Sequence, residues 1–427
     1  MCLSRSPVVP FSLFHVPRTA LACRALSAAA LLLLWLPGMA APAMAQETRR
    51  ELLEQRRTER AQELKPYEPG KLEAAVMWVE RGQLIERWTS GYDGWYPRVG
   101  SITRGGGFAV GAGYRQHLGL QVRTEASAAI SLRNSRAADV DIALPYLADR
   151  RLELGVHGEY RLFPQQDYFG IGPDSLRANR VSYLQEHTEI AARAKFRPLT
   201  WLETGAEIGW LNLDIGAGRD PRFPSIEALF SEDAGAPGLA EQPDYRRSRL
   251  WVTVDYRDQP GNARSGGLYT ASWGDYSDRD TRRYSFGRFD AEARQYFPIF
   301  DKKRVIAVRA LFAYANNDPG GAVPFYMLPT LGGSTSVRGF RNFRFHDENA
   351  LLLNAEYRWE AFSGLDMALF FDAGEVRPDW HDIDLQDLVT SYGVGFRFNN
   401  YKDVFLRLDV GFGGEGTRLF IAFGPNF

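Results

Sequence analysis

The stretch LDMALFFDAGEV, residues 365–376, alternates between two kinds of side chain. One face is apolar and carries Met367, Leu369, Phe371 and Ala373. The other face is mixed and carries Ala368, Phe370, Asp372 and Gly374. Because successive side chains of a β-strand point to opposite faces, this period of two predicts a strand with one apolar side.

The same alternation recurs in ALLLNAEYRW (350–359), SYGVGFRFNN (391–400) and DVFLRLDVGF (403–412). A soluble β-sandwich also alternates, but its strands average about five or six residues. The strands here run to about nine to fourteen residues, and a tilted strand needs about nine to eleven to cross a bilayer. An open sheet edge in lipid leaves backbone groups unpaired, so such a sheet must close. The sequence therefore predicts an all-β fold, a closed antiparallel transmembrane barrel.

The strand count agrees with this class. Strands are expected to begin near Trp95, Gly105, Leu120, Ala138, Arg150, Val181, Thr200, Arg247, Gly267, Arg283, Lys303, Asn349, Leu365, Ser391, Asp403 and Arg418, which makes sixteen. Bacterial single-chain barrels have even strand numbers. Connections alternate between short turns (RPLT, FDKK, FSG, NNYK) and long loops (164–180, 214–245, 316–348, 377–390). Short periplasmic turns and long external loops produce this asymmetry.

The first 45 residues have the pattern of a signal peptide. Arg18 and Arg24 form a basic flank, and residues 25–36 are an apolar run too short to span a bilayer as a helix. Small residues at Ala43 and Ala45 predict cleavage after Ala45; the alternative is a membrane anchor. Cys2 and Cys23 both precede this cut, so the mature protein is expected to contain no disulfide.

Residues 46–92 are predicted to be a short periplasmic helical segment ahead of a barrel at 93–427. ETRRELLEQRRTERAQELK (47–65) places Glu and Arg three or four residues apart, which supports a solvated helix. KLEAAVMWVERGQLIERW (71–88) is more amphipathic.

The long connection 316–348 contains LGGSTSVRGFRNFRF, residues 331–345. Arg338 is always charged and carries five donors in a fixed fork. Strand alternation turns Asp372 to the interior, where a bidentate Arg–carboxylate bond would hold the loop inside the barrel. Glu356, also inward-facing, is a second possible acceptor. The alternative is that Arg338 is a solvated loop charge.

Three ordered motifs and the chain end carry a family resemblance. They are VRGF (Val337, Arg338, Gly339, Phe340), F-x-D-x-G (Phe370, Asp372, Gly374), G-x-G-x-R (Gly393, Gly395, Arg397) and the terminal Phe427. Over roughly residues 95–427 the chain resembles the BamA/TamA-like bacterial surface antigen superfamily of barrel-assembly factors and two-partner-secretion transporters. The resemblance implies that the VRGF tip folds into the lumen against strands carrying the other two motifs.

The end of the chain, RLFIAFGPNF, is expected to be a last strand with Leu419, Ile421, Phe423 and Phe427 on one apolar face. The resemblance implies that Phe427 is the signal read by the barrel-insertion machinery during biogenesis. Expected surroundings are outer-membrane lipids, lipopolysaccharide included, with the segment at 46–92 in the periplasm. The barrel is expected to be a monomer.

The resemblance implies a function in inserting or translocating outer-membrane or surface components, with a polypeptide client. Family members with that role carry periplasmic POTRA domains, which residues 46–92 are too short to hold. A stand-alone barrel of this family is therefore expected. This departure keeps a second hypothesis open, a structural or passive, plugged or weakly conducting barrel without clients.

Other chemistry has little support in the sequence. The net charge of −1 gives no indication of nucleic-acid binding. GGGFAVGAGYR (105–115) lacks the following helix that a dinucleotide site needs. The six histidines never occur at ligand spacing, and the acidic loop 377–390 is either an ordinary solvated loop or a divalent-cation site. We therefore predict no enzyme activity, no catalytic residues, no cofactor and no metal, and an outer-membrane lipid hydrolase is the weakest hypothesis.

Overall fold

A computed structural model describes residues 56, 58–59, 93–119, 121–400 and 402–427. The chain divides into two compact units, Met1–Glu68 and Pro69–Phe427. In the first unit the described residues, 56 and 58–59, are helical. The predicted signal peptide (1–45) and nearly all of the predicted helical segment (46–92) lie outside the described residues, so both stay predictions.

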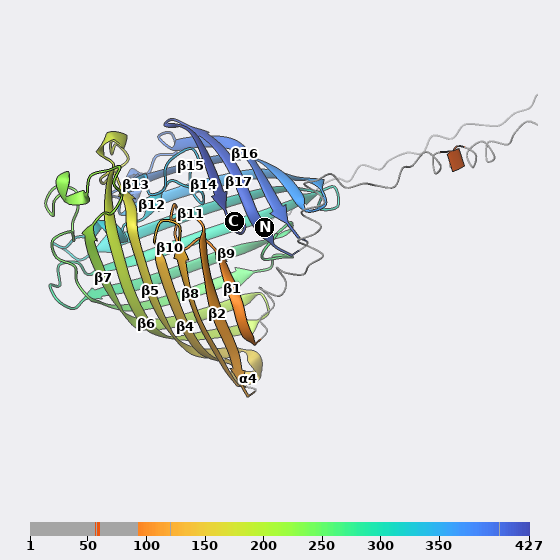
Figure 1. The fold of residues 1–427 in the computed structure, drawn as a ribbon, viewed down its shortest axis with the longest axis horizontal. Coiled ribbons are helices and arrows are strands. Elements are labelled where there is room, and N and C mark those ends of the chain that lie inside the picture. The colour runs from red at the N-terminus through yellow and green to blue at the C-terminus, as the bar shows by residue number, and fades with distance from the viewer. Residues whose placement is uncertain (1–55, 57, 60–92, 120, 401) are drawn as a thin grey trace, which may run out of the picture. The chain divides into compact units, whose positions relative to one another are not determined.

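The second unit contains a sixteen-stranded antiparallel sheet in which each strand pairs with the next along the chain (Figure 1). Its strands are β1 (Gly94–Gly100), β2 (Ala109–Leu118), β3 (Val122–Ser131), β4 (Arg136–Tyr146), β5 (Leu152–Tyr168), β6 (Val181–Leu199), β7 (Leu202–Ala217), β8 (Tyr245–Asp255), β9 (Gly266–Asp278), β10 (Phe286–Ile299), β11 (Arg304–Asn317), β14 (Asn349–Phe362), β15 (Leu365–Arg377), β16 (Val389–Asn399), β17 (Val404–Gly413) and β18 (Gly416–Ala422). The predicted number and order of strands are confirmed.

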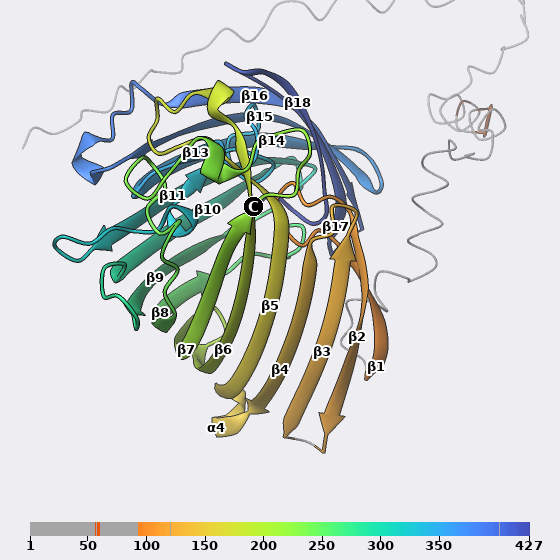
Figure 2. The same cartoon turned by 60° about the vertical axis from the view of Figure 1, so that its left-hand side comes forward.

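Short elements occupy the connections. They are α4 (Leu147–Arg150), the 3-10 turns η1 (Arg177–Asn179), η2 (Ile226–Ala228), η3 (Phe325–Met327) and η4 (Trp380–Asp382), and the two-residue strands β12 (Thr330–Leu331) and β13 (Phe345–His346). Figure 2 shows α4 at one end of the strands and the long connection after β7 at the opposite end. No helix among the described residues is both long and apolar enough to span a bilayer.

Side chains alternate between the two faces of the sheet as the sequence predicts. On β15, Leu369 and Phe371 are 49% and 50% exposed, whereas Phe370 and Asp372 are 4% and 0% exposed. On the strands from β2 to β8 the inner face carries ion pairs, which are Arg115–Glu125, Arg161–Asp139, Arg193–Asp141 and Arg247–Glu189. An apolar outer face and a polar lumen are the arrangement of a transmembrane barrel.

We expect Leu369→Arg to lower the free energy of unfolding by about 2–4 kcal/mol, because it places a charge on the outer face near the middle of β15. Leu385→Arg is the matched control, since Leu385 is 68% exposed in the loop that follows β15 and its substitution should be nearly neutral. Urea unfolding of both variants refolded in lipid vesicles measures the difference. Equal stabilities would contradict the inside–outside assignment.

The sheet is not sealed into a complete ring. Among the described residues the ladder begins at β1 and ends at β18, and no register joins these two strands. We call this junction the seam. Apart from this seam the sixteen-stranded antiparallel barrel is nearly closed, and the predicted fold class is confirmed.

One periplasmic connection is longer than predicted. The residues between β8 and β9, 256–265, fold across to strands far along the chain, and we call them the periplasmic strap. The Gly261 carbonyl accepts a hydrogen bond of 3.0 Å from the backbone N–H of Val404. Arg264 Nη2 lies 2.6 Å from Asp366 Oδ2 on β15. The expectation that every turn at this end is short is therefore wrong.

Candidate functional site

Loop 6, residues 318–348, joins β11 to β14 and folds into the lumen. Its neck is closed by the pairing of β12 with β13, Thr330 with His346 and Leu331 with Phe345. Gly332 follows β12 at a φ of +107°, and a Cβ there would lie 2.2 Å from the Arg341 carbonyl oxygen. Glycine is thus required for this neck, which explains part of the Gly-rich sequence.

The tip of loop 6, residues 337–340, is buried against the barrel wall. Val337 and Phe340 are 0% and 5% exposed. They pack with loop residues Leu331 and Phe345 and with wall residues Ala313, Ala350, Leu352 and Val376. This apolar cluster places the Arg338 side chain among the inward-facing polar residues of β14 to β17.

Arg338 is 0% exposed and is held chiefly by Asp372. Its Nε and Nη2 donate to Asp372 Oδ2 and Oδ1 at 2.9 and 2.6 Å, and its backbone N–H donates to Oδ2 at 3.0 Å. Its Nη1 donates to Glu356 Oε1. The guanidinium lies 3.5 Å from the centre of the Phe370 ring. Charge-assisted bonds of this bidentate geometry are strong and directional.

The strand register explains how the Asp372 carboxylate is oriented for its bond with Arg338. Asn354 on β14 and Ser391 on β16 are its cross-strand neighbours, so all three side chains point into the lumen. Asn354 Nδ2 donates to Asp372 Oδ1 at 2.8 Å, and Ser391 Oγ donates to Oδ2 at 3.2 Å. The barrel wall therefore orients the Asp372 carboxylate through bonds that do not involve Arg338.

A second layer of charges surrounds this contact. Glu356 accepts from Arg397 Nη2 at 3.0 Å and from Arg358 Nε at 2.7 Å. Arg397 Nη1 also donates to Asp409 Oδ1, and Arg407 Nη2 donates to the loop carbonyl of Ser334 at 2.8 Å. The predicted site residues Arg338, Glu356, Asp372 and Arg397 thus meet in one network. Arg407 and Asp409 belong to it as well, although no sequence motif distinguishes them from other lumenal charges.

Burial disfavours the charge of Arg338, but the carboxylates of Glu356, Asp372 and Asp409 outweigh burial and raise its pKa. The guanidinium therefore stays charged at any physiological pH. Removing one partner from such a buried group leaves an uncompensated charge, which is the costly way to break it. We call Arg338, Glu356 and Asp372 the loop lock.

The predicted wall glycines have several different neighbours. A Cβ on Gly374 would lie 3.4 Å from Val337 Cγ2, so this glycine lies against loop 6 as expected. A Cβ on Gly393 would lie 2.0 Å from the Val410 carbonyl oxygen and 2.5 Å from Phe370 Cζ, and one on Gly395 would lie 2.3 Å from Arg397 Nη1. Gly393 and Gly395 therefore make room for atoms of the barrel wall and not for loop 6, although the resemblance implies that the loop tip lies against their strand.

The close approach of the loop backbone occurs on β17. A Cβ on Gly411 would lie 2.3 Å from the Arg338 carbonyl oxygen, and one on Gly413 would lie 3.0 Å from Gly339 Cα. The sequence could have predicted this approach, because both glycines fall on inward positions of the alternating stretch DVGFGG at 409–414.

Phe427 does not continue the apolar face of the last strand. Leu419 and Ile421 are 66% and 64% exposed, but Phe427 is 2% exposed. It packs with Ala263, Tyr296, Val305 and Ala307. Arg358 Nη2 donates to the Phe427 carbonyl oxygen at 3.2 Å. The predicted outward orientation of Phe427 is wrong; its use as an insertion signal stays a prediction.

The structure also brings together residues whose sequence spacing gave no signal. His157, Glu189 and Glu207, on β5, β6 and β7, place their ligand atoms within 4.8 Å of one another. Arg247 Nη2 lies 2.6 Å from Glu189 Oε1 and also contacts Glu207. The guanidinium thus supplies positive charge where a metal ion would otherwise be needed.

The acidic loop 377–390 pairs part of its charge internally. Arg377 Nη2 lies 3.1 Å from Asp387 Oδ2 and also contacts Glu375. Asp379 accepts from the backbone N–H of His381 at 2.9 Å and caps η4. These contacts favour a structured, solvated loop over a cation site.

Comparison with known proteins places the barrel in a family. The Omp85 superfamily domain matches residues 116–412. The structure resembles BamA from Haemophilus ducreyi lacking POTRA domains 1-3, with a TM-score of 0.58 and 14% identity, over 78% of this chain and 70% of that chain. It resembles CdiB from Escherichia coli with a TM-score of 0.51 and 13% identity, over 78% of this chain and 62% of that chain. No curated protein matches the sequence significantly. Because the domain match covers most of the chain, this protein belongs to the Omp85 superfamily as a BamA/TamA-like outer-membrane barrel.

Proposed function

We propose that this barrel assists the insertion of outer-membrane or surface polypeptides, and that it acts through the seam between β1 and β18. The observation that carries the proposal is the pair of unjoined edge strands in a barrel whose outer face is apolar. In lipid, each unpaired backbone N–H or C=O costs several kcal/mol. An incoming strand that adds to such an edge satisfies these groups.

The two edge strands are offset and short. A Cβ on Gly100, at the end of β1, would lie 4.0 Å from Phe423 Cβ, just after the end of β18. The C-terminal end of β1 therefore lies beside the C-terminal end of β18. Antiparallel strands in full register would place it beside the N-terminal end of β18 instead. Each strand has seven residues, fewer than the about nine to eleven that cross a bilayer. A short apolar wall thins the bilayer beside it, which lowers the barrier to insertion at the seam.

The contents of the lumen favour insertion at the seam over translocation through the barrel. Loop 6 is held at mid-barrel by the loop lock. The periplasmic strap is bonded to β15 and β17, and Phe427 is buried against Ala263 of the strap. A polypeptide that passed through the lumen would have to displace all three.

The test is a disulfide across the seam in the Gly100→Cys/Phe423→Cys variant. The Cβ separation of 4.0 Å lies within the range of about 3.5–4.5 Å that a disulfide needs. Gly100 has a φ of +154°, which strains a side chain, so heat-modifiable mobility must first show that the reduced variant is folded. Reconstituted in vesicles, the reduced variant should speed the folding of a urea-denatured eight-stranded outer-membrane barrel, measured by its heat-modifiable mobility on gels. The oxidised variant should lose this acceleration, and reduction should restore it.

Val410→Cys/Leu419→Cys is the matched control, because these residues are register partners within the existing β17–β18 ladder. Its disulfide should leave the acceleration unchanged. Equal acceleration by the oxidised and reduced seam variants would refute the proposed role of the seam.

A passive barrel without clients is the second candidate. The filled lumen is as consistent with this candidate as with insertion at the seam. It predicts that wild-type protein leaves the folding rate of the probe barrel at that of protein-free vesicles. It also predicts an unchanged outer-membrane proteome in a deletion strain. In both candidates the barrel resides in outer-membrane lipid and acts without a catalytic centre.

A further inference from the structure

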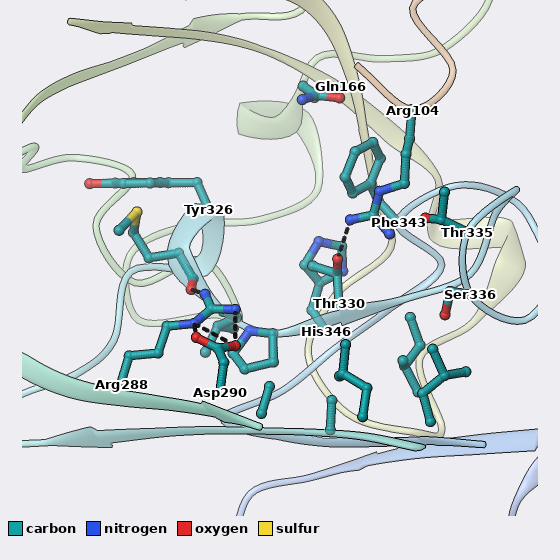
Figure 3. A pocket seen from close by; sticks show the side chains of 18 of the residues that line it. Arg104, Gln166, Arg288, Asp290, Tyr326, Thr330, Thr335, Ser336, Phe343 and His346 are labelled. Carbon is teal, nitrogen blue, oxygen red and sulfur yellow. Dashed lines mark hydrogen bonds and ion pairs between the residues drawn. The ribbon is translucent and has the colours of Figure 1, made fainter. Parts of the chain in front are cut away.

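A cavity of about 350 Å³ lies inside the barrel between loop 6 and the wall formed by β6, β10 and β11 (Figure 3). This volume is at the small end of the range of ligand sites. Arg104, from the loop between β1 and β2, reaches it from one side, and Arg288 on β10 lines the opposite side (Figure 3). Arg309 on β11 also lines it.

Positive charge exceeds negative charge around this cavity. Arg288 is neutralised by Asp290, with Nε–Oδ2 and Nη2–Oδ1 distances of 2.9 and 3.0 Å. Arg309 shares the carboxylate of Glu292 with Arg294, so one carboxylate serves two guanidinium groups. These groups leave one positive charge in excess before Arg104 is counted.

Arg104 has no carboxylate partner among the described residues. Its Nη2 donates to Thr330 Oγ1 at 2.8 Å, and its guanidinium lies 4.5 Å from the centre of the Phe343 ring. A hydroxyl and an aromatic face do not neutralise a guanidinium. Burial together with the charge of Arg309 lowers the pKa of Arg104 to about 10, so it remains charged at neutral pH.

The positive charges around the cavity also affect the pKa of a neighbouring histidine. His346 lines the cavity and is 1% exposed. Burial, with Arg104 and Arg344 nearby, lowers its pKa to about 3, so its ring is neutral. The charges of the cavity therefore call for an anion and not for a cation.

We propose that this cavity binds a small soluble molecule bearing a phosphate group, held by Arg104 and Arg309. Arg309 Nη1 donates to the Thr335 carbonyl oxygen at 2.8 Å and Arg104 Nη2 donates to Thr330, but each guanidinium carries five N–H donors and keeps others for phosphate oxygens. A phosphate accepts hydrogen bonds from several directions. The side chains of Gln166, Gln185 and Thr335 also line the cavity and can bond further oxygens or hydroxyls of the ligand. Residues of β6, β10 and β11 line the cavity from the lumen side, so the barrel wall separates it from phospholipid headgroups in the bilayer.

The experiment titrates glucose 1-phosphate and inorganic phosphate into the purified, folded protein in detergent at constant ionic strength, with glucose as the uncharged comparison. Calorimetry should show saturable binding of both phosphate probes and none of glucose. Arg104→Gln should weaken binding by about tenfold or more, the value of one charge-assisted bond. Arg104→Lys, which keeps the charge without the fork, should weaken binding less.

Arg133→Gln is the matched control, since Arg133 is an exposed arginine of another external loop and does not line the cavity. The affinity of Arg133→Gln for both phosphate probes should equal that of the wild type. Heat-modifiable gel mobility verifies that each variant is folded, and if Arg104→Gln fails to fold, Arg104→Lys decides the question.

Three results would overturn the proposal. The first is the absence of saturable phosphate binding by the wild type, and the second is unchanged affinity in both Arg104 variants. The third is competition by short-chain phosphatidylglycerol, which would indicate a lipid-facing site instead. The test uses no client, so its outcome is independent of the role of the seam.

Discussion

Arg338→Ala should lower the free energy of unfolding by about 3–5 kcal/mol, because it leaves buried carboxylates without their principal cation. Arg338, Glu356 and Asp372 have fully buried side chains in the structure. A partly wet lumen would have reduced this cost, but none of the three side chains is accessible to solvent. Urea unfolding of barrels refolded in vesicles measures the loss.

A double-mutant cycle tests whether the residues of the loop lock act as one unit. Asp372→Ala should cost about as much as Arg338→Ala, and the double variant should cost little more than either, since partners in one network are not additive. Arg338→Lys should recover only part of the stability, because lysine cannot donate two parallel bonds to Asp372. Purely additive losses would exclude direct coupling of the pair.

Arg341→Ala supplies the control within the same loop. Arg341 lies three residues after Arg338 and makes no ion pair among the described residues. Arg341 is half-buried but leaves no carboxylate unpaired when it is removed, so its replacement should change the free energy of unfolding by less than about 1 kcal/mol. Trypsin should cleave loop 6 faster in Arg338→Ala than in the wild type or Arg341→Ala. Only Arg338→Ala breaks the loop lock and releases the loop.

Local alternation was enough to predict the wall of the barrel and the inward position of Asp372. The strand signal depends only on neighbours two residues apart, and tertiary contacts did not override it on β14 to β17. The meeting of Arg338 with Asp372 followed from ordered motifs combined with this alternation. Arg407 and Asp409 were on the predicted inner face as well, but no motif distinguished them from other lumenal charges.

Features that depend on distant contacts could not be predicted in the same way. The periplasmic strap is fixed by Arg264 and Asp366, which are 102 residues apart. The group of His157, Glu189 and Glu207 exists only because three strands are in a particular register. The unjoined seam follows from the offset of β1 and β18, and alternation carries no information about such an offset.

Phe427 shows where alternation was extended too far. β18 ends at Ala422, and Gly424 has a φ of +81°, a conformation that glycine adopts readily. Pro425 follows, and proline does not continue a central strand. The GP pair at 424–425 was therefore a turn signal, and the residues beyond it no longer alternate with the strand.

Phe427→Ala should lower the free energy of unfolding by about 3–5 kcal/mol, the usual cost of deleting a buried aromatic ring. The ring is packed against Ala263, Tyr296, Val305 and Ala307, and the guanidinium of Arg358 lies 5.2 Å from its centre. The effect should appear in protein refolded from urea in vesicles, where no insertion machinery is present. Phe423→Ala is the control, since its ring is 37% exposed and should lose much less.

The comparison of refolded and cellular protein separates two roles of Phe427. If Phe427 holds the lumenal end of the chain, refolded Phe427→Ala is unstable and releases the periplasmic strap, so protease cleavage between residues 256 and 265 accelerates. If it acts only as an assembly signal, the refolded variant has wild-type stability and only its outer-membrane level in cells falls. The burial of the ring and the bond from Arg358 predict the first result, and a stable refolded variant with an intact strap would contradict it.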